Sequence, residues 1–410
     1  VDFDCEAIYT MAVRYMITDI FCKNAGTEEG AINAKGISPE NSLSGSSAPG
    51  YWGIIKHNQI FFDRYSYDYT AEHGAGAVET LRRTGINCSA ADSTSISDNL
   101  IVGANEHDIR VQGNENSPQA LLQVKDNRSR DFLGDVSIIL RGAFEDMDVC
   151  ENSCVTSENN PAGTCRYILY EVTANHGLTR DRNRFNGNRL VFNDPTFTGT
   201  IALPDLGMNN YAFNVLQAND NIWDVTVDNA AQQNPCWLRD TGSGAATFGD
   251  RFEMKGWIFT KTVTDASFQP LRWQNLGAGR VRDYDIDIRI RWEVNDNTSR
   301  TVCRFRASED NAIGVDMDYI AMRTDQLGPV LKEKRSMTGF DKTGDPVEPD
   351  GLVASAGLTE HSERVGTAAL VSDFLQPSGR DIIERINGND NETWRFDLQL
   401  RARALCGASA

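Results

Sequence analysis

The chain has 410 residues, a formal net charge of −18 at pH 7 and a sequence pI of about 4.7. Contacts to nucleic-acid phosphates need clustered Lys and Arg side chains, whereas the basic residues here alternate with acidic ones, so the composition excludes a nucleic-acid partner. The length exceeds that of one ordinary hydrophobic core and indicates two or three domains.

The N-terminal part of the chain predicts a helix followed by an arm. Apolar residues between positions 5 and 22 recur near helical spacing, which is typical of an amphipathic helix. Arg14 and Asp19 interrupt the apolar run, so we expect no membrane span. Residues 24–50 are rich in Gly, Ser, Asn and Pro, which predicts a loop or arm.

Aromatic residues are concentrated between positions 51 and 69. The favoured interpretation is a pair of strands that pack on the core, and the alternative is a platform for sugar rings. The candidate binding residues of that platform are Tyr51, Trp52, Tyr65 and Tyr67. A helical pattern at 77–83 follows, which predicts a short helix.

The clearest secondary-structure signal lies between Asp283 and Val294. Apolar and charged residues alternate there without a break, which predicts a strand with one buried and one exposed face. Similar patterns at 136–141 and 394–404 predict two more such strands. With a turn at 295–298, the long strand should form a hairpin with 300–306, because this register places like residues on like faces. The predicted pairs are Glu293–Arg300, Asp287–Arg306, Ile290–Cys303 and Ile288–Phe305.

Several landmarks recur in the same order about 150 residues apart, which indicates an internal duplication. Arg130-Asp131-Phe132 resembles Arg282-Asp283-Tyr284, and the strand at 136–141 resembles that at 286–291. We therefore predict a mainly β protein with two tandem homologous antiparallel β-sandwich domains, jelly-roll or immunoglobulin-like. The expected boundaries are 1–87 for the N-terminal helix, arm and aromatic strands, 88–235 for the first β-domain and 236–410 for the second.

Nine scattered cysteines without zinc-site spacing favour disulfides in an oxidising compartment, and free thiols in a reducing one are the alternative. The duplication would pair Cys165 with Cys236 and Cys303 with Cys406. This interpretation makes the protein secreted, extracellular or attached to a cell surface. The odd cysteine would be free or would bond another subunit.

No common catalytic motif occurs in the sequence, so we expect no enzyme. Asp146, Asp148 and Glu151 form a pattern that resembles the acidic strand of some β-sandwich glycoside hydrolases, where two carboxylates serve as nucleophile and acid/base. Because the chain has 58 acidic residues, accidental occurrence is the favoured interpretation.

No cofactor is expected, with the exception that Asn-rich loops around Asp220 and Asp390 could bind calcium. An ordinary turn explains the same composition and is favoured. Asparagines in the glycosylation pattern are Asn87, Asn127, Asn297 and Asn391, and they matter only in a secreted protein of an organism that glycosylates.

Three functions fit these observations. The favoured one is a structural protein that assembles with copies of itself into a filament, shell or surface layer, because tandem similar domains offer repeated contacts. The second is an extracellular glycan-binding or glycan-cleaving β-sandwich protein, with the aromatic residues at 51–69 as its site. The third is a viral coat subunit.

Overall fold

A computed structural model describes residues 6–10, 14–23, 33–39, 52–62, 82–89, 93–113, 119–132, 134, 136–142, 144–156, 164–171, 182–192, 200–202, 215–225, 238–239, 249–260, 271–274, 281–294, 300–306, 311–324, 330–341, 352–354, 358–365, 373–378, 381–386 and 392–406. The chain divides into two compact units, Val1–Phe197 and Thr198–Ala410. The regular elements in the described ranges are all strands.

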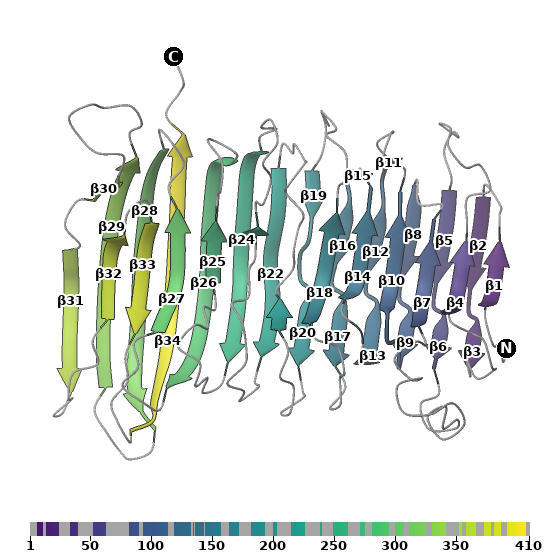
Figure 1. Cartoon of the computed structure of the whole chain (residues 1–410), viewed down its shortest axis with the longest axis horizontal. Helices are drawn as coiled ribbons and strands as arrows, with labels where there is room; N and C mark the ends of the chain where they lie inside the picture. The colour runs from purple at the N-terminus through teal and green to yellow at the C-terminus, as the bar shows by residue number, and fades with distance from the viewer. Residues whose placement is uncertain are drawn as a thin grey trace. The chain divides into compact units, whose positions relative to one another are not determined.

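Unit 1 is a parallel β-helix in which each coil contributes one strand to each of three sheets (Figure 1, purple to blue). All its described strand pairs are parallel. Sheet I contains β1 (Glu6–Thr10), β4 (Asn33–Pro39), β7 (Arg82–Cys88), β10 (His107–Gln112), β14 (Val136–Arg141) and β18 (Thr164–Glu171). Sheet II contains β2 (Arg14–Thr18), β5 (Trp52–Lys56), β8 (Thr94–Ser97), β12 (Gln123–Lys125), β16 (Asp148–Cys150) and β19 (Arg182–Arg184). Sheet III contains β3 (Phe21–Lys23), β6 (Gln59–Phe61), β9 (Leu100–Val102), β13 (Arg128–Phe132), β17 (Ser153–Thr156) and β20 (Arg189–Phe192). The short strands β11 (Gln119–Ala120) and β15 (Phe144–Glu145) pair with each other.

Identical apolar residues stack from coil to coil along sheet I. Five consecutive strands place isoleucine at one register position, and each of these residues is at most 2% exposed. The column contains Ile37, Ile86, Ile109, Ile138 and Ile168. Burial of each such side chain stabilises the fold by roughly 1.5–3 kcal/mol, so the column is a main source of coil-to-coil cohesion.

The corner between sheets II and III has the same backbone conformation in every coil. The residue that opens the corner has a positive φ of 54–66° in all six described coils. These residues are Asp19, His57, Asp98, Asp126, Glu151 and Gly187. Asp, Asn and Gly tolerate this left-handed region better than other residues, which explains the acidic bias of the corner.

A buried asparagine follows the corner residue in five successive coils. The ladder consists of Asn58, Asn99, Asn127, Asn152 and Asn188. In the first four members, the amide Nδ2 donates to Oδ1 of the next asparagine at 2.9–3.0 Å, and in all five Nδ2 donates to a backbone carbonyl of the preceding coil. Because both polar atoms of each amide are paired, the ladder fixes coil register without leaving buried polar groups unsatisfied.

Unit 2 changes from parallel to antiparallel pairing within one sheet (Figure 1, teal to yellow). In that sheet β22 (Val215–Val225), β24 (Gly249–Thr260) and β26 (Val281–Val294) are parallel, and β34 (Trp394–Cys406) lies antiparallel between β26 and β28 (Asn311–Arg323). It continues with β29 (Val330–Asp341), β30 (Leu352–Ala354) and β31 (Leu358–Val365). A second sheet contains β23 (Leu238–Arg239), β25 (Leu271–Gln274), β27 (Arg300–Arg306), β33 (Asp381–Ile386) and β32 (Asp373–Ser378). The strand β21 (Thr200–Ala202) also belongs to this unit.

The predicted N-terminal helix is wrong. Residues 6–10, 14–18 and 21–23 form β1, β2 and β3, the first described coil of the β-helix. The helical spacing arose because short strands separated by turns place apolar residues three or four positions apart. The predicted helix at 77–83 is also wrong at Arg82 and Arg83, which begin β7, and the rest of it lies outside the described residues. No helix that could span a membrane occurs in the described part of the chain.

The predicted duplication into two antiparallel β-sandwiches is wrong as well. The two segments that we matched, 136–141 and 286–291, are strands as expected but have unlike neighbours. β14 lies between parallel strands in the β-helix, whereas β26 has one parallel and one antiparallel neighbour. The predicted domain boundary at 87/88 falls within β7. Recurrence of strand-forming residue types, without a shared topology, produced the resemblance.

The long strand itself is confirmed as β26, but its predicted hairpin partner is wrong. β26 pairs with β34, and β27 pairs with β25 and β33 in the other sheet. β34 offers an equally regular alternation, so Ile290 faces Leu398 and Glu293 faces Arg395. Over the eleven pairs of β26 with β34, apolar residues face apolar residues on one side of the sheet and polar residues face polar residues on the other. The longer strand β34 therefore satisfies the same alternation that we used to predict the hairpin.

Candidate functional site

The outer face of β26 and β34 carries a ladder of charged side chains. Alternation buries Ile286, Ile288 and Ile290 completely on the inner face. The outer face then pairs acids of one strand with bases of the other, with Asp285 3.3 Å from Arg403 and Asp287 3.5 Å from Arg401. Such exposed pairs contribute little to stability individually, so the ladder matters more as a surface than as a support.

Asp397 is the centre of this ladder. Its two carboxylate oxygens accept hydrogen bonds from Arg289 Nε at 2.6 Å and Nη2 at 2.7 Å, and Arg291 Nη2 adds a third at 3.3 Å. Partial burial alone would raise the pKa of Asp397, but the hydrogen bonds and charge of Arg289, followed by those of Arg291, outweigh it and lower that pKa. The bidentate contact also raises the pKa of Arg289. The pair is therefore ionised and held in one geometry.

Trp257 lies beside this pair on the neighbouring strand. β24 places Trp257 opposite Arg289, and the Arg289 guanidinium carbon lies 4.7 Å from the centroid of the indole ring. The side chain of Trp257 remains 37% exposed. On the other side of Arg289, Gln399 donates from Nε2 to Asp287 Oδ1 at 3.0 Å. We call Trp257, Arg289, Arg291, Asp397 and Gln399 the Trp257 site.

The Trp257 site combines an accessible aromatic surface with ionised and amide groups that are already oriented. Ile320, 48% exposed, is the register partner of Asp397 on β28 and adds an apolar border. All these side chains project from long strands, which position groups more rigidly than loops do. The arrangement can offer a ligand stacking area, carboxylate acceptors and guanidinium donors at once.

Of the aromatic residues predicted to bind sugars, only Trp52 lies in the described part of the chain. It begins β5, faces Arg14 of β2 and is 45% exposed. Tyr51, Tyr65 and Tyr67 lie outside the described residues. The two strands expected at 51–69 correspond to β5 and β6, each parallel to its neighbours. Trp52 is thus a second exposed tryptophan among the described residues, on unit 1.

The three acidic residues that form the candidate catalytic pattern have different structural surroundings. Asp146 and Glu151 occupy turns on either side of β16, both with positive φ. Asp148 is buried on β16 between two cations: Arg184 donates to both its oxygens at 2.5 and 2.8 Å, and Lys125 Nζ lies 3.1 Å away. A carboxylate neutralised in this way acts as a charge partner of its neighbouring coils.

The remaining candidate residues either lie within regular elements of the fold or lie outside the described residues. Asn127 is a ladder residue, and Asn87 is 6% exposed and donates to Ser38 Oγ at 3.3 Å, so both amides are buried and hydrogen-bonded. Asn297 and Asn391 lie outside the described residues. Asp220 lies within β22, where its register with β24 shifts, and Asp390 is not described.

The described cysteine side chains are those of Cys22, Cys88, Cys150 and Cys154, and none of them forms a disulfide. Cys165, Cys303 and Cys406 lie in strands whose side chains are not described at these positions, and Cys236 is outside the description, so both proposed bridges remain predictions. Among the described residues, no cluster of three or more His, Cys, Asp or Glu side chains is placed to bind a metal.

Two features escaped the sequence reasoning. The Trp257 site could have been found from the alternation of Lys255, Trp257 and Phe259, which places an aromatic ring on a strand face with charged neighbours. The ladder had a signal too, because Asn recurs after an acidic residue at positions 99, 127 and 152. The irregular spacing of these pairs concealed a repeat whose loops differ in length.

Comparison with known proteins gives remote likeness only. No protein-family model and no curated protein sequence matches the chain. A crystal structure of a tailspike protein from Acinetobacter baumannii phage AM24 is similar over 97% of this chain and 74% of its own, with 10% identity and a TM-score of 0.25. A tailspike protein, gp49, from Acinetobacter baumannii bacteriophage Fri1, a capsular polysaccharide depolymerase, is similar over 93% and 70%, with 8% identity and a TM-score of 0.22.

Proposed function

We propose that this chain is a glycan-binding protein and that the Trp257 site contacts the sugar. The observation that carries the proposal is an exposed indole ring beside a bidentate Arg289–Asp397 pair on a regular sheet. The earlier structural, self-assembling interpretation depended on a duplication that the fold removes, so glycan binding becomes the leading function.

The chemistry of a sugar ring matches the site. A pyranose has an apolar C–H face, which an indole ring can cover, and a rim of hydroxyl groups that need donors and acceptors. Asp397 supplies acceptors and Arg289 and Arg291 supply donors, all held before a ligand arrives. Groups that are already ordered lose little conformational entropy on binding, which favours affinity at a shallow surface.

The same geometry favours binding over cleavage. Glycoside hydrolysis commonly requires a carboxylic acid with a raised pKa that can protonate the leaving oxygen. Asp397 is held ionised by two arginines, and its pKa is lowered. The group is therefore suited to accept hydrogen bonds from hydroxyl groups and unsuited to donate a proton.

A glycan array probed with the full chain, followed by calorimetric titration of the best glycan, tests this function. Trp257→Ala should weaken binding about tenfold or more, equivalent to about 1.4 kcal/mol. Trp52→Ala is the matched control, because Trp52 is a similarly exposed tryptophan on unit 1. Its affinity should equal that of the unchanged protein.

Two results would count against the proposal. Absence of binding to every glycan on an array that covers neutral and acidic polysaccharides would remove the function itself. Loss of binding in Trp52→Ala, with Trp257→Ala unchanged, would retain glycan binding and transfer the site to unit 1.

A further inference from the structure

An ionisable side chain lies inside the β-helix of unit 1. Asp108 on β10 is 2% exposed, and its Oδ2 accepts a hydrogen bond from Ser137 Oγ of β14 at 2.6 Å. The Cys154 thiol of β17 lies 4.0 Å from the same oxygen. The other oxygen, Oδ1, has no hydrogen-bond partner among the described residues. A buried carboxyl oxygen without a partner costs free energy, so the site calls for a further ligand.

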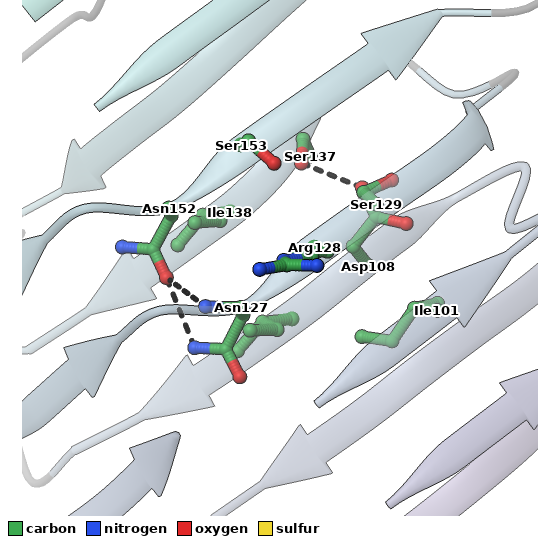
Figure 2. A pocket seen from close by; sticks show the side chains of 10 residues that line it. Ile101, Asp108, Asn127, Arg128, Ser129, Ser137, Ile138, Asn152 and Ser153 are labelled. Atoms are coloured by element: carbon green, nitrogen blue, oxygen red, sulfur yellow. Dashed lines mark hydrogen bonds between the residues drawn. The ribbon is translucent and has the colours of Figure 1, made fainter. Parts of the chain in front are cut away.

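A small cavity is lined by Asp108, the residue that carries this oxygen (Figure 2). Its volume is about 10 Å³, close to the space that one water molecule occupies. Polar residues from four strands and two corners line it, together with Ile101, Ile109 and Ile138. Ser129, which also lines the cavity, has a buried Oγ that forms no hydrogen bond of ordinary geometry among the described residues, although its hydroxyl lies near enough to Asp108 to oppose the rise in that pKa. Two residues that each carry an unsatisfied polar atom therefore line one water-sized space.

We propose that this cavity is a binding site for a single water molecule that bridges Asp108 Oδ1 and Ser129 Oγ. A water in this position can donate to the carboxyl oxygen and exchange a hydrogen bond with the hydroxyl, so both unpaired atoms gain a partner. Buried waters commonly make about three such bonds, and the Ser153 residue at the cavity wall adds a further polar neighbour.

Neither an empty cavity nor a bound cation fits the lining as well. Dry cavities are lined by apolar groups, whereas this one has a carboxyl group and serine hydroxyls in its wall. Hard cations such as calcium take six or more oxygen ligands. The amide oxygens nearby are occupied, since Asn127 Oδ1 accepts from Asn99 and Asn152 Oδ1 accepts from Asn127.

The water would serve both protonation states of Asp108. Burial raises the pKa of Asp108 to about 7, and the hydroxyls of Ser129 and Ser137 oppose that rise only in part. A water donates to the carboxylate above this pH and accepts from the carboxylic acid below it. The water thus gives the carboxyl group a hydrogen-bond partner in both protonation states. A group that can only donate would pair with the carboxylate and could not accept from the carboxylic acid.

A crystal structure of the full chain at about 1.2 Å resolution tests the proposal. We expect one density peak at about 2.6–3.2 Å from both Asp108 Oδ1 and Ser129 Oγ. Ser129→Ala should lose or displace the peak, and Ser97→Ala, which removes a half-exposed hydroxyl from β8, should retain it. A cavity without density, or a peak at the shorter distances and higher coordination of a metal ion, would overturn the proposal. If Ser129→Ala does not fold, the density in the unchanged protein decides.

Discussion

Asp108 and Asp397 are both hydrogen-bonded carboxyl groups, yet their pKa values move in opposite directions. Burial dominates at Asp108, where the partners are neutral hydroxyl groups, and the charged form is disfavoured. At Asp397 the two arginines outweigh the same penalty, and the charged form is favoured. The nature of the nearest partner, ion or hydroxyl, therefore decides how each unit responds to pH.

Unit 1 should lose stability as the pH rises towards neutrality. The folded pKa of Asp108, about 7, lies above the ordinary aspartate value of 3.8, so the folded state retains a proton that the unfolded state releases between these values. The stability present below about pH 4 is lost as the pH rises through about 7, and three pKa units correspond to about 4 kcal/mol. Urea unfolding from about pH 4 to 8 measures this loss. Asp108→Asn should abolish most of it, and a slope equal to that of the unchanged protein would contradict the assignment.

At the scale of the element, the asparagine ladder connects five coils through hydrogen bonds of side-chain amides to one another and to the backbone. Asn127 accepts from the backbone N–H and the amide of Asn99, and donates to Ile96 O and Asn152 Oδ1. Removal of one member therefore leaves unpaired groups in both neighbouring coils. In a repeat structure each coil contacts only its neighbours, so such a defect weakens the contacts that join the coils on its two sides.

Asn127→Ala should destabilise unit 1 by about 2–5 kcal/mol, because several buried donors and acceptors lose their partner together. Gln123→Ala, at a half-exposed position on β12 three residues before the corner residue Asp126, is the matched control and should change stability by less than about 0.5 kcal/mol. Equilibrium unfolding in urea, followed by circular dichroism, compares the two variants. Similar midpoints for both would show that the ladder contributes little to coil cohesion.

Sequence patterns determined individual strands better than their partners. The alternation around Ile286, Ile288 and Ile290 predicts β26 and its buried face, since period 2 is a local property. The choice of β34 over β27 as neighbour could not be predicted, because both strands alternate and offer opposite charges at compatible positions. The β-helix coils were missed for a different reason: their strands are two to eight residues long, too short for a clear period.

The candidate site illustrates the same limit. Trp257 and Asp397 are 140 positions apart in sequence and become neighbours only through the order β24–β26–β34. The aromatic cluster at 51–69 was visible because its members lie close together in the sequence, and Trp52 is indeed exposed. A site assembled by strand order across a sheet is invisible to composition, whereas a site within one segment is not.

At the scale of the whole molecule, the two units are stabilised by different kinds of contact. Unit 1 depends on each coil stacking on the next, with register fixed by the ladder and the isoleucine column. Unit 2 depends on pairings between distant segments, such as β26 with β34. Contacts of high sequence separation form slowly because loop closure costs entropy before they stabilise the fold.

We therefore expect calorimetry of the full chain to resolve two unfolding transitions with opposite responses to pH. The contribution of Asp397 is present above its unfolded pKa and is lost as the pH falls through its lower folded pKa, so acid should weaken unit 2. Neutral pH should weaken unit 1 through Asp108, whose shift has the other sign. Asn127→Ala should lower only the transition that is sensitive to neutral pH, and Asp397→Asn only the acid-sensitive one, by less than about 1 kcal/mol because that pair is partly exposed. A single transition that both substitutions lower together would mean that the two compact units unfold as one cooperative body.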